Sequence, residues 1–182
     1  MSASRVKILS GWTLPGGSTK SHISLTNLLN DNNIDCTFYG PQDWHLDKCQ
    51  SGLFKDLKVV EADDIIVSHF CQLPHMECKK HILSCHETNL FPLKRMDLSQ
   101  YDVIQYVSNS QKKWHSVNHP SVVIPPIVEK INWKNPENGA AGVVGSIDPH
   151  KQTHLSIRGA LEAGYSKAVS YTHLTLPTNR EV

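Results

Sequence analysis

The sequence contains no apolar run of the roughly 20 residues that are needed to span a bilayer. Its first residues, Met1 to Lys7, do not lead into the long apolar core of a signal peptide. An excess of charge is also missing, because 18 Lys and Arg balance 17 Asp and Glu and supply no broad field that would attract a nucleic-acid backbone. We therefore expect a cytoplasmic protein that does not bind nucleic acid.

The five cysteines include no Cys-x2-Cys pair, and their odd number does not suit a disulfide framework. We expect free thiols in a reducing compartment. A zinc-binding protein is nevertheless one alternative, because residues of zinc-binding type crowd together at His69, Cys71, His75, Cys78, His81, Cys85 and His86. These residues divide between two predicted strands and the segment that joins them, and they would point in different directions. We therefore expect no metal.

The amino-terminal residues predict a β-α-β unit. A short apolar segment from Val6 to Trp12 leads into a glycine turn at Gly16-Gly17. Apolar residues then recur at helical spacing from Ile23 to Leu29, and a second strand is predicted from Ile34 to Tyr39.

Further short apolar strands alternate with helix-length polar or amphipathic stretches. These strands are predicted at Ile65 to Ser68, His81 to Cys85, Val103 to Val107 and Val122 to Ile124. Such alternation predicts an α/β fold, in which a Rossmann-like parallel sheet is covered by helices on both faces.

The chain divides into four parts on this interpretation. Residues 1–128 form a Rossmann-like domain, and the polar stretch 129–140 forms a linker. Residues 141–168 begin a second Rossmann-like domain, with a strand at Ala141 to Gly145 and a helix at Thr153 to Ala163 that ends at Gly164. We expect this second domain to be truncated, because it offers only one strand and one helix.

The last part, residues 169–182, has an unusual source. Val169 to Thr178 resembles a translation of the transposase adaptor used in DNA library preparation, GTC TCT TAT ACA CAT CTG ACG CTG CCG ACG. On this interpretation Asn179 to Glu181 would be encoded by the eight-base index of the adaptor, and Val182 by the GTG codon that precedes a TAG stop. The alternative is a real strand and turn, because Val169 to Leu176 has strand-like composition. We assign no functional residue to this segment.

Three places could bind a ligand. Gly16, Gly17 and Ser18 lie between the first strand and the first helix, where the backbone can approach a phosphate, although on composition alone two glycines favour an ordinary tight turn. His86 follows a strand, at the sheet edge where α/β proteins bind ligands; a solvated loop histidine is its alternative. Lys151 lies near the start of the second domain's helix and could pair with a phosphate, or it could be a solvated surface lysine.

Two weaker features concern glycans and membranes. Trp44 and His45 could line a sugar site, although packing of a loop explains Trp44 as well. A basic face would allow peripheral contact with a membrane, although dispersed solvating charge is the alternative. The residues that would form this face are Lys79, Lys80, Lys94, Lys112 and Lys113.

Five motifs follow one another along the chain: Pro15-Gly16-Gly17, His86-Glu87, Val107 to Ser110, Val123 to Val128 and Val144 to Lys151. Taken in this order, they resemble the motifs of retaining GT-B glycosyltransferases of the GT4-type family. That family has a glycine loop, V-H-E, S-x-S before a helix, V-I-P-N-G-V-D and V-G-R-x-x-x-x-K-G. The resemblance extends over about Val6 to Lys167, with Ser146 at the arginine position and Pro126-Ile127 in place of Asn-Gly.

The resemblance implies two facing Rossmann-like domains with the active site between them. It implies a hexosyltransferase-like enzyme that transfers a sugar from a nucleotide-sugar donor, with retained configuration, to a carbohydrate, lipid or small-molecule acceptor. His86 would contact the donor sugar, Gly16, Gly17, Ser18 and Lys151 would bind the donor phosphates, and no cofactor is required. We expect the chain by itself to be inactive. The alternative from another class is a single-domain nucleotide-binding or interaction module.

Overall fold

A computed structural model describes residues 5–11, 16–41, 49–57, 60–69, 76–87, 93–127, 141–144, 152–165, 168–171 and 180–181. The chain divides into two compact units, Met1–Val128 and Glu129–Val182. Among the helices of the described residues, none is both long enough and apolar enough to cross a membrane.

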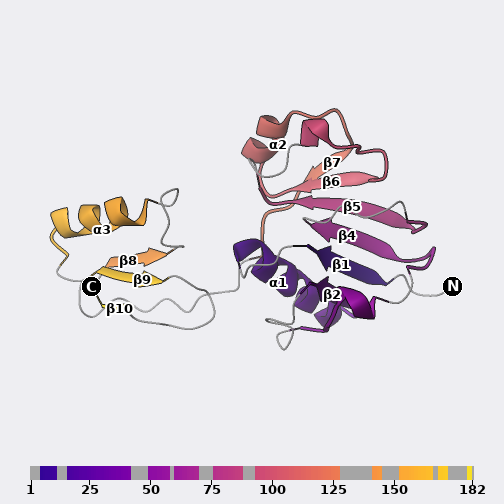
Figure 1. Cartoon of the computed structure of the whole chain (residues 1–182), viewed down its shortest axis with the longest axis horizontal. Helices are drawn as coiled ribbons and strands as arrows, with labels where there is room; N and C mark the ends of the chain where they lie inside the picture. The colour runs from indigo at the N-terminus through magenta and orange to yellow at the C-terminus, as the bar shows by residue number, and fades with distance from the viewer. Residues whose placement is uncertain are drawn as a thin grey trace. The chain divides into compact units, whose positions relative to one another are not determined.

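The first unit is built on a seven-stranded sheet whose order is β3-β2-β1-β4-β5-β6-β7, and every neighbouring pair is parallel (Figure 1). This arrangement confirms the predicted α/β fold with a Rossmann-like parallel sheet. The strands are β1 (Val6–Ser10), β2 (Cys36–Gly40), β3 (Ser51–Leu53), β4 (Ile65–His69), β5 (Lys80–Cys85), β6 (Val103–Tyr106) and β7 (Ser121–Val123).

Helices lie on both faces of this sheet, as predicted. Helix α1 (Gly17–Asp31) reaches β5 through a hydrogen bond between His22 and Ser84. Helix α2 (Asn109–His115) reaches the same strand through a contact between His115 and Cys85. Because successive strand residues point to opposite faces, the two helices cover opposite faces.

Each face has its own apolar core. On the α1 face, the core consists of Val6, Ile8, Cys36, Phe38 and Val67, with Leu25 and Leu29 of the helix packed against it. On the α2 face, it consists of Leu83, Cys85, Leu93, Tyr101, Ile104 and Tyr106. Leu93 belongs to a short 3-10 helix, η3 (Leu93–Arg95).

The turn between α1 and β2 is fixed by one side chain. The Asn30 amide donates to the carbonyl of Cys36 and accepts from the N–H of Cys36, at 2.9 Å in both cases. Asn33 then takes a φ of 61°, a left-handed conformation that Asn tolerates better than most residues. β2 therefore begins at Cys36 and not at the predicted Ile34.

Two other parts of the first unit differ from the predictions. β1 ends at Ser10, and Trp12 lies outside the described residues. β3 and the adjoining 3-10 helix η2 (Phe54–Asp56) were not predicted. β3 has three residues and a glycine at its centre, so it lacks the apolar alternation that marks a strand.

A buried carboxylate joins the amino-terminal ends of β1 and β4. The fully buried Asp64 side chain accepts from the Lys7 ammonium at 2.6 Å, from Arg5 at 3.1 Å and from the N–H of Glu61 at 2.8 Å. Burial raises the pKa of Asp64, but the Glu61 N–H and the Lys7 ammonium outweigh this effect and hold the pKa below its usual value. The carboxylate is therefore ionised at neutral pH.

The second unit contains a smaller sheet of order β10-β9-β8. β8 (Ala141–Val144) and α3 (Thr153–Glu162) correspond to the predicted strand and helix, and Gly164 follows the helix with a left-handed φ of 89°. β9 (Ala168–Tyr171) is parallel to β8, and β10 (Arg180–Glu181) is antiparallel to β9. The adaptor origin of residues 169–182 concerns the DNA and stays a prediction.

Candidate functional site

The strand order places a ligand-binding edge between β1 and β4. The sheet grows in one direction from β1 through β2 to β3, and in the other direction from β4 to β7. Open α/β sheets bind ligands outside the carboxyl ends of their strands at such a reversal. Ser10 and His69 end these two strands and are register partners. The fold therefore predicts a site around these residues.

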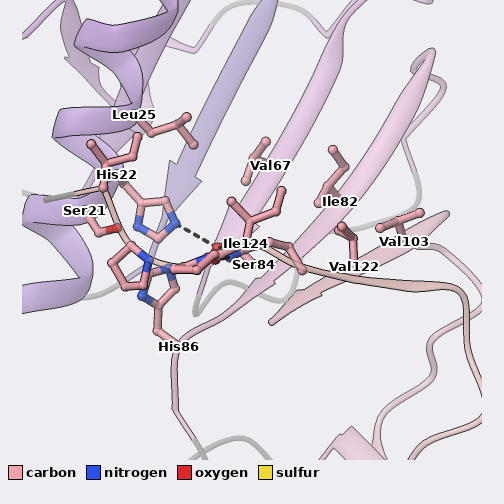
Figure 2. Close-up of a pocket in the computed structure, with 14 residues that line it drawn as sticks. Ser21, His22, Leu25, Val67, Ile82, Ser84, His86, Val103, Val122 and Ile124 are labelled. Carbon is pink, nitrogen blue, oxygen red and sulfur yellow. Dashed lines mark hydrogen bonds between the residues drawn. The ribbon is translucent and has the colours of Figure 1, made fainter. Parts of the chain in front are cut away.

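Three histidines from three elements meet at this edge. His22 comes from the second turn of α1, His69 ends β4 and His86 follows β5. The ring centre of His22 lies 4.7 Å from those of both His69 and His86, and the His69 and His86 centres are 5.3 Å apart. Figure 2 shows the His22 and His86 rings side by side. We call these residues the histidine cluster.

The first hydrogen-bond chain of the cluster runs through His69. Its Nε2 lies 3.3 Å from a carboxylate oxygen of Glu87, and its Nδ1 lies 3.1 Å from the Ser10 hydroxyl. A carboxylate only accepts, so Nε2 donates to Glu87 and, in a neutral ring, Nδ1 accepts from Ser10. This Ser-His-Glu order resembles that of serine hydrolases, but Ser10 is only 1% exposed, so a substrate cannot reach its hydroxyl. A nucleophilic Ser10 is therefore not supported.

The second chain fixes the tautomer of His22. The Gln105 amide donates to the carbonyl of Ile124 at 2.9 Å, so its oxygen accepts from the Ser84 hydroxyl at 2.6 Å. Ser84 has only one proton, and it must therefore accept from Nε2–H of His22 at 3.0 Å (Figure 2). Nδ1 of His22 then carries a lone pair, and this buried atom has no hydrogen-bond partner among the described residues.

Two rings of the cluster, those of His22 and His86, are held uncharged at neutral pH. Burial lowers the pKa of His86 to about 4, and the nearby His69 adds to this effect while Glu87 opposes it. Burial, followed by His69 and His86, lowers the pKa of His22 well below its usual value; the carbonyl of Ser18 acts in the other direction. Both rings are therefore neutral imidazoles, which can donate hydrogen bonds to hydroxyl groups and accept hydrogen bonds from them. They have no positive charge that would attract a phosphate.

The structure brings some of the predicted site residues together. Gly16, Gly17 and Ser18 lie at the start of α1, about one helical turn before His22, and His22 touches His86. Gly16 is extended, with φ of −160°, and a Cβ added to Gly17 would meet no atom within 4 Å. The predicted phosphate ligand Lys151 lies outside the described residues, as do Trp44 and His45.

The residues proposed for zinc do not converge, as far as the structure describes them. His81 and Cys85 lie on the α2 face of β5, whereas His69 and His86 lie at the edge on the α1 side. Burial raises the pKa of the Cys85 thiol to about 12, so the thiol is protonated at neutral pH in the metal-free protein. Cys71 and His75 lie outside the described residues. Within the described ranges, no three or more His, Cys, Asp or Glu side chains are arranged so that they could hold a metal ion.

Sequence reasoning overlooked several residues of this site. His22, Ser10, Ser84 and Gln105 were not candidates, and His69 was considered only as a zinc ligand. One signal was available: Ser10, His69 and His86 each end an apolar strand or directly follow one, and parallel strands end at a common edge. The place of His22 within a helix gave no such signal.

A pocket of about 150 Å³ adjoins the histidine cluster on the α1 face. His22, Ser84 and His86 line one part of it (Figure 2). Gln105 also belongs to the lining. Comparison of the chain with models of known protein families gave no match, and comparison with curated proteins gave none either.

The lowered histidine pKa values predict that the first unit loses stability in mild acid. Below about pH 6.5 the His86 side chain becomes protonated in the unfolded chain, whereas in the folded protein it stays neutral until the pH approaches its pKa of about 4. His86 alone should cost about 2 kcal/mol of unfolding free energy between pH 7 and pH 5, and His22 acts in the same direction. Urea unfolding at both pH values measures this slope. His86→Gln should flatten it; an unchanged slope would show that His86 is not held neutral by the fold.

Proposed function

We propose that the chain is the acceptor-side domain, with the start of a donor-binding domain, of a retaining glycosyltransferase that uses a nucleotide-sugar donor. One observation carries this proposal. His86, the counterpart of the donor-sugar histidine in the family that the sequence resembles, lies at the carboxyl edge of a Rossmann-like sheet, in contact with the helix that follows the glycine loop.

The chemistry of the cluster supports a role in sugar binding. A neutral imidazole both donates and accepts hydrogen bonds, as sugar hydroxyls do. Among the described residues, no hydrogen bond engages a ring nitrogen of His86, so the ring is available to a ligand. With a pKa of about 4, it stays in this form throughout the neutral range.

The start of α1 supports a role in phosphate binding. The first N–H groups of a helix lack partners within it, and the helix dipole favours an anion at this end. Gly16 and Gly17 present no side chain that would obstruct a diphosphate. In the proposed reaction the protein holds donor and acceptor in place and stabilises the departing diphosphate, and none of its side chains acts as a nucleophile.

The substitution Gly17→Ala separates ligand binding from folding. The added methyl group meets open space, and alanine restricts the unfolded chain more than glycine, so stability should stay constant or rise by about 0.5–1 kcal/mol. The same methyl group would stand where the diphosphate approaches the backbone. We expect at least tenfold weaker binding of a nucleotide diphosphate, measured by calorimetry or NMR across a panel of UDP-, GDP- and ADP-sugars.

Gly159→Ala is the matched control, because a Cβ there also meets open space, but in α3 of the second unit. It should leave binding unchanged. Equal nucleotide binding by Gly17→Ala and the unaltered chain would remove the glycine loop from the proposed site. Tight binding of a free nucleotide without any preference for nucleotide sugars would favour a nucleotide-binding module instead.

A further inference from the structure

The pocket beside the histidine cluster has two chemically different ends. Its polar end, at the carboxyl edge of the sheet, is lined by Ser21, His22, Ser84, His86 and Gln105. Its other end runs over the α1 face of β4 to β7 and is aliphatic. The side chains there are Leu25, Val67, Ile82, Val103 and Val122 (Figure 2). Ile124, which lies beside Ser84 in Figure 2, and Pro125, Pro126 and Ile127, which follow it, complete the lining toward the carboxyl edge.

The lining carries no charge at neutral pH. None of the described residues that line the pocket is Asp, Glu, Lys or Arg, and its two histidines have lowered pKa values. No Phe, Tyr or Trp is among them either, so no aromatic face is offered to a pyranose ring. The aliphatic end therefore suits neither a phosphate nor a sugar, and its uncharged surface matches an uncharged hydrocarbon.

Apolar side chains of β7 remain in contact with water on this face. Val122 is 40% exposed and Ile124, which follows the strand, is 51% exposed. On the opposite face of the same strand, Val123 packs into the core beside α2. Strands of parallel sheets are usually buried on both faces, so covering Val122 and Ile124 with hydrocarbon is favourable.

The polar end indicates how the hydrocarbon terminates. In the neutral ring of His86 one nitrogen donates and the other accepts, and among the described residues no hydrogen bond engages either of them. A hydroxyl group is the uncharged partner that both donates and accepts. The two ends together describe an amphipathic alcohol.

We propose that this pocket binds the aliphatic chain of an alcohol whose hydroxyl lies at His86, and that the acceptor of the proposed transferase is a lipid of this kind. Binding of an aliphatic chain is inferred from the pocket alone, whereas the role of the alcohol as acceptor rests on the proposed function. In that role the hydroxyl oxygen bonds to the anomeric carbon of the donor. The bond from that carbon to the nucleoside diphosphate breaks, and the hydroxyl proton passes to the departing diphosphate.

Alkanols of increasing length, added to the full-length polypeptide, test whether the pocket binds an aliphatic chain. We expect 1-butanol, 1-hexanol and 1-octanol to shift the NMR signals of the pocket residues, with affinity rising about fourfold for each added methylene group, which corresponds to about 0.8 kcal/mol. Octanoate should bind at least tenfold more weakly than 1-octanol, because its charged end meets uncharged histidines. Both Val122→Asn and Ile124→Asn should weaken octanol binding at least tenfold.

Leu28→Asn is the control, because Leu28 is 45% exposed on α1 but does not line the pocket. It should leave octanol binding unchanged, and thermal melts verify that all three variants fold. Affinity independent of chain length, octanoate binding as tight as octanol binding, or full binding by Ile124→Asn would each overturn the proposal. So would a dimer that Ile124→Asn dissociates while octanol fails to bind, because a second copy would then cover this face.

A separate titration with nucleotide sugars keeps the two proposals distinguishable. Octanol binding without any nucleotide-sugar binding would support the pocket as an alcohol-binding site but contradict its role as the acceptor site of a transferase. Nucleotide-sugar binding without octanol binding would retain the transferase and overturn the lipid assignment.

Discussion

Replacing His86 with alanine is expected to lower the turnover of a nucleotide sugar by at least 100-fold in an enzyme that joins this chain to a complete donor-binding domain. The reason is the loss of a neutral hydrogen-bonding group that contacts the second turn of α1, about one helical turn from the glycines where the donor is proposed to bind. Removing one preorganised hydrogen-bonding partner from a transition state typically costs about 100- to 1000-fold in rate. Transfer and hydrolysis of the donor, measured at saturating concentration, give the effect.

His119→Ala is the control, because it makes the same chemical change at the amino-terminal edge of the sheet, away from the candidate site. His119 lies just before β7, and its Nε2 contacts the carbonyl of Tyr101 at 2.8 Å. Loss of this hydrogen bond should lower the free energy of unfolding by about 1 kcal/mol. Turnover should change by less than about threefold, because the bond lies away from the proposed active site. Unchanged turnover in His86→Ala, in a protein that melts normally, would remove His86 from the active site.

Asp64→Ala is expected to cost about 3–5 kcal/mol of unfolding free energy, because it takes the carboxylate partner away from a largely buried ammonium. The Lys7 side chain is only 11% exposed, so water cannot replace the carboxylate. Such a loss is a large part of the roughly 5–15 kcal/mol that stabilises an ordinary domain. Urea unfolding followed by circular dichroism measures it.

Glu61→Ala is the control for this prediction. Glu61 pairs with Arg5 at 2.7 Å, but its side chain is 60% exposed, and exposed pairs contribute about 0–1 kcal/mol. The double variant Lys7→Met/Asp64→Leu should recover most of the loss, because it removes both buried charges together. Equal losses in Asp64→Ala and Glu61→Ala would show that burial of the Asp64 pair adds nothing to stability.

The Asp64 carboxylate also contributes to acid sensitivity. Its folded pKa is depressed, so its contribution is complete above the unfolded value of about 3.9 and is lost as the pH falls through the folded pKa. The neutral histidines lower the free energy of unfolding over a higher pH range, between about pH 6.5 and pH 4. Two acid-induced steps with different residues behind them are therefore expected.

Much of the fold could be predicted because parallel strands are continuous apolar runs. β4, β5 and β6 were placed within a residue or two of their observed ends, since each is apolar on both faces. β3 escaped prediction because a three-residue edge strand with a central glycine has no such pattern. The boundary of β2 was displaced because it depends on the Asn30 side chain, a contact that periodicity does not reveal.

The site could be predicted in part, for a related reason. His86 was chosen as a candidate because it directly follows a strand, and that position is visible in the sequence. His22 became part of the site only through the packing of α1 against β5, and its tautomer follows from Ser84, Gln105 and Ile124, which lie far along the chain. Neither the aliphatic pocket nor its lack of charge could be predicted, because its lining comes from five separate elements.

The measurement that tests the central claim most directly is an NMR titration of the isotope-labelled chain with nucleotide sugars. The account predicts concentration-dependent shifts of the amides of Gly16, Gly17 and Ser18 and of the His86 ring, with a nucleotide sugar shifting His86 more than the free nucleoside diphosphate does. Absence of shifts at these four residues at millimolar ligand, or shifts confined to other parts of the chain, would contradict it.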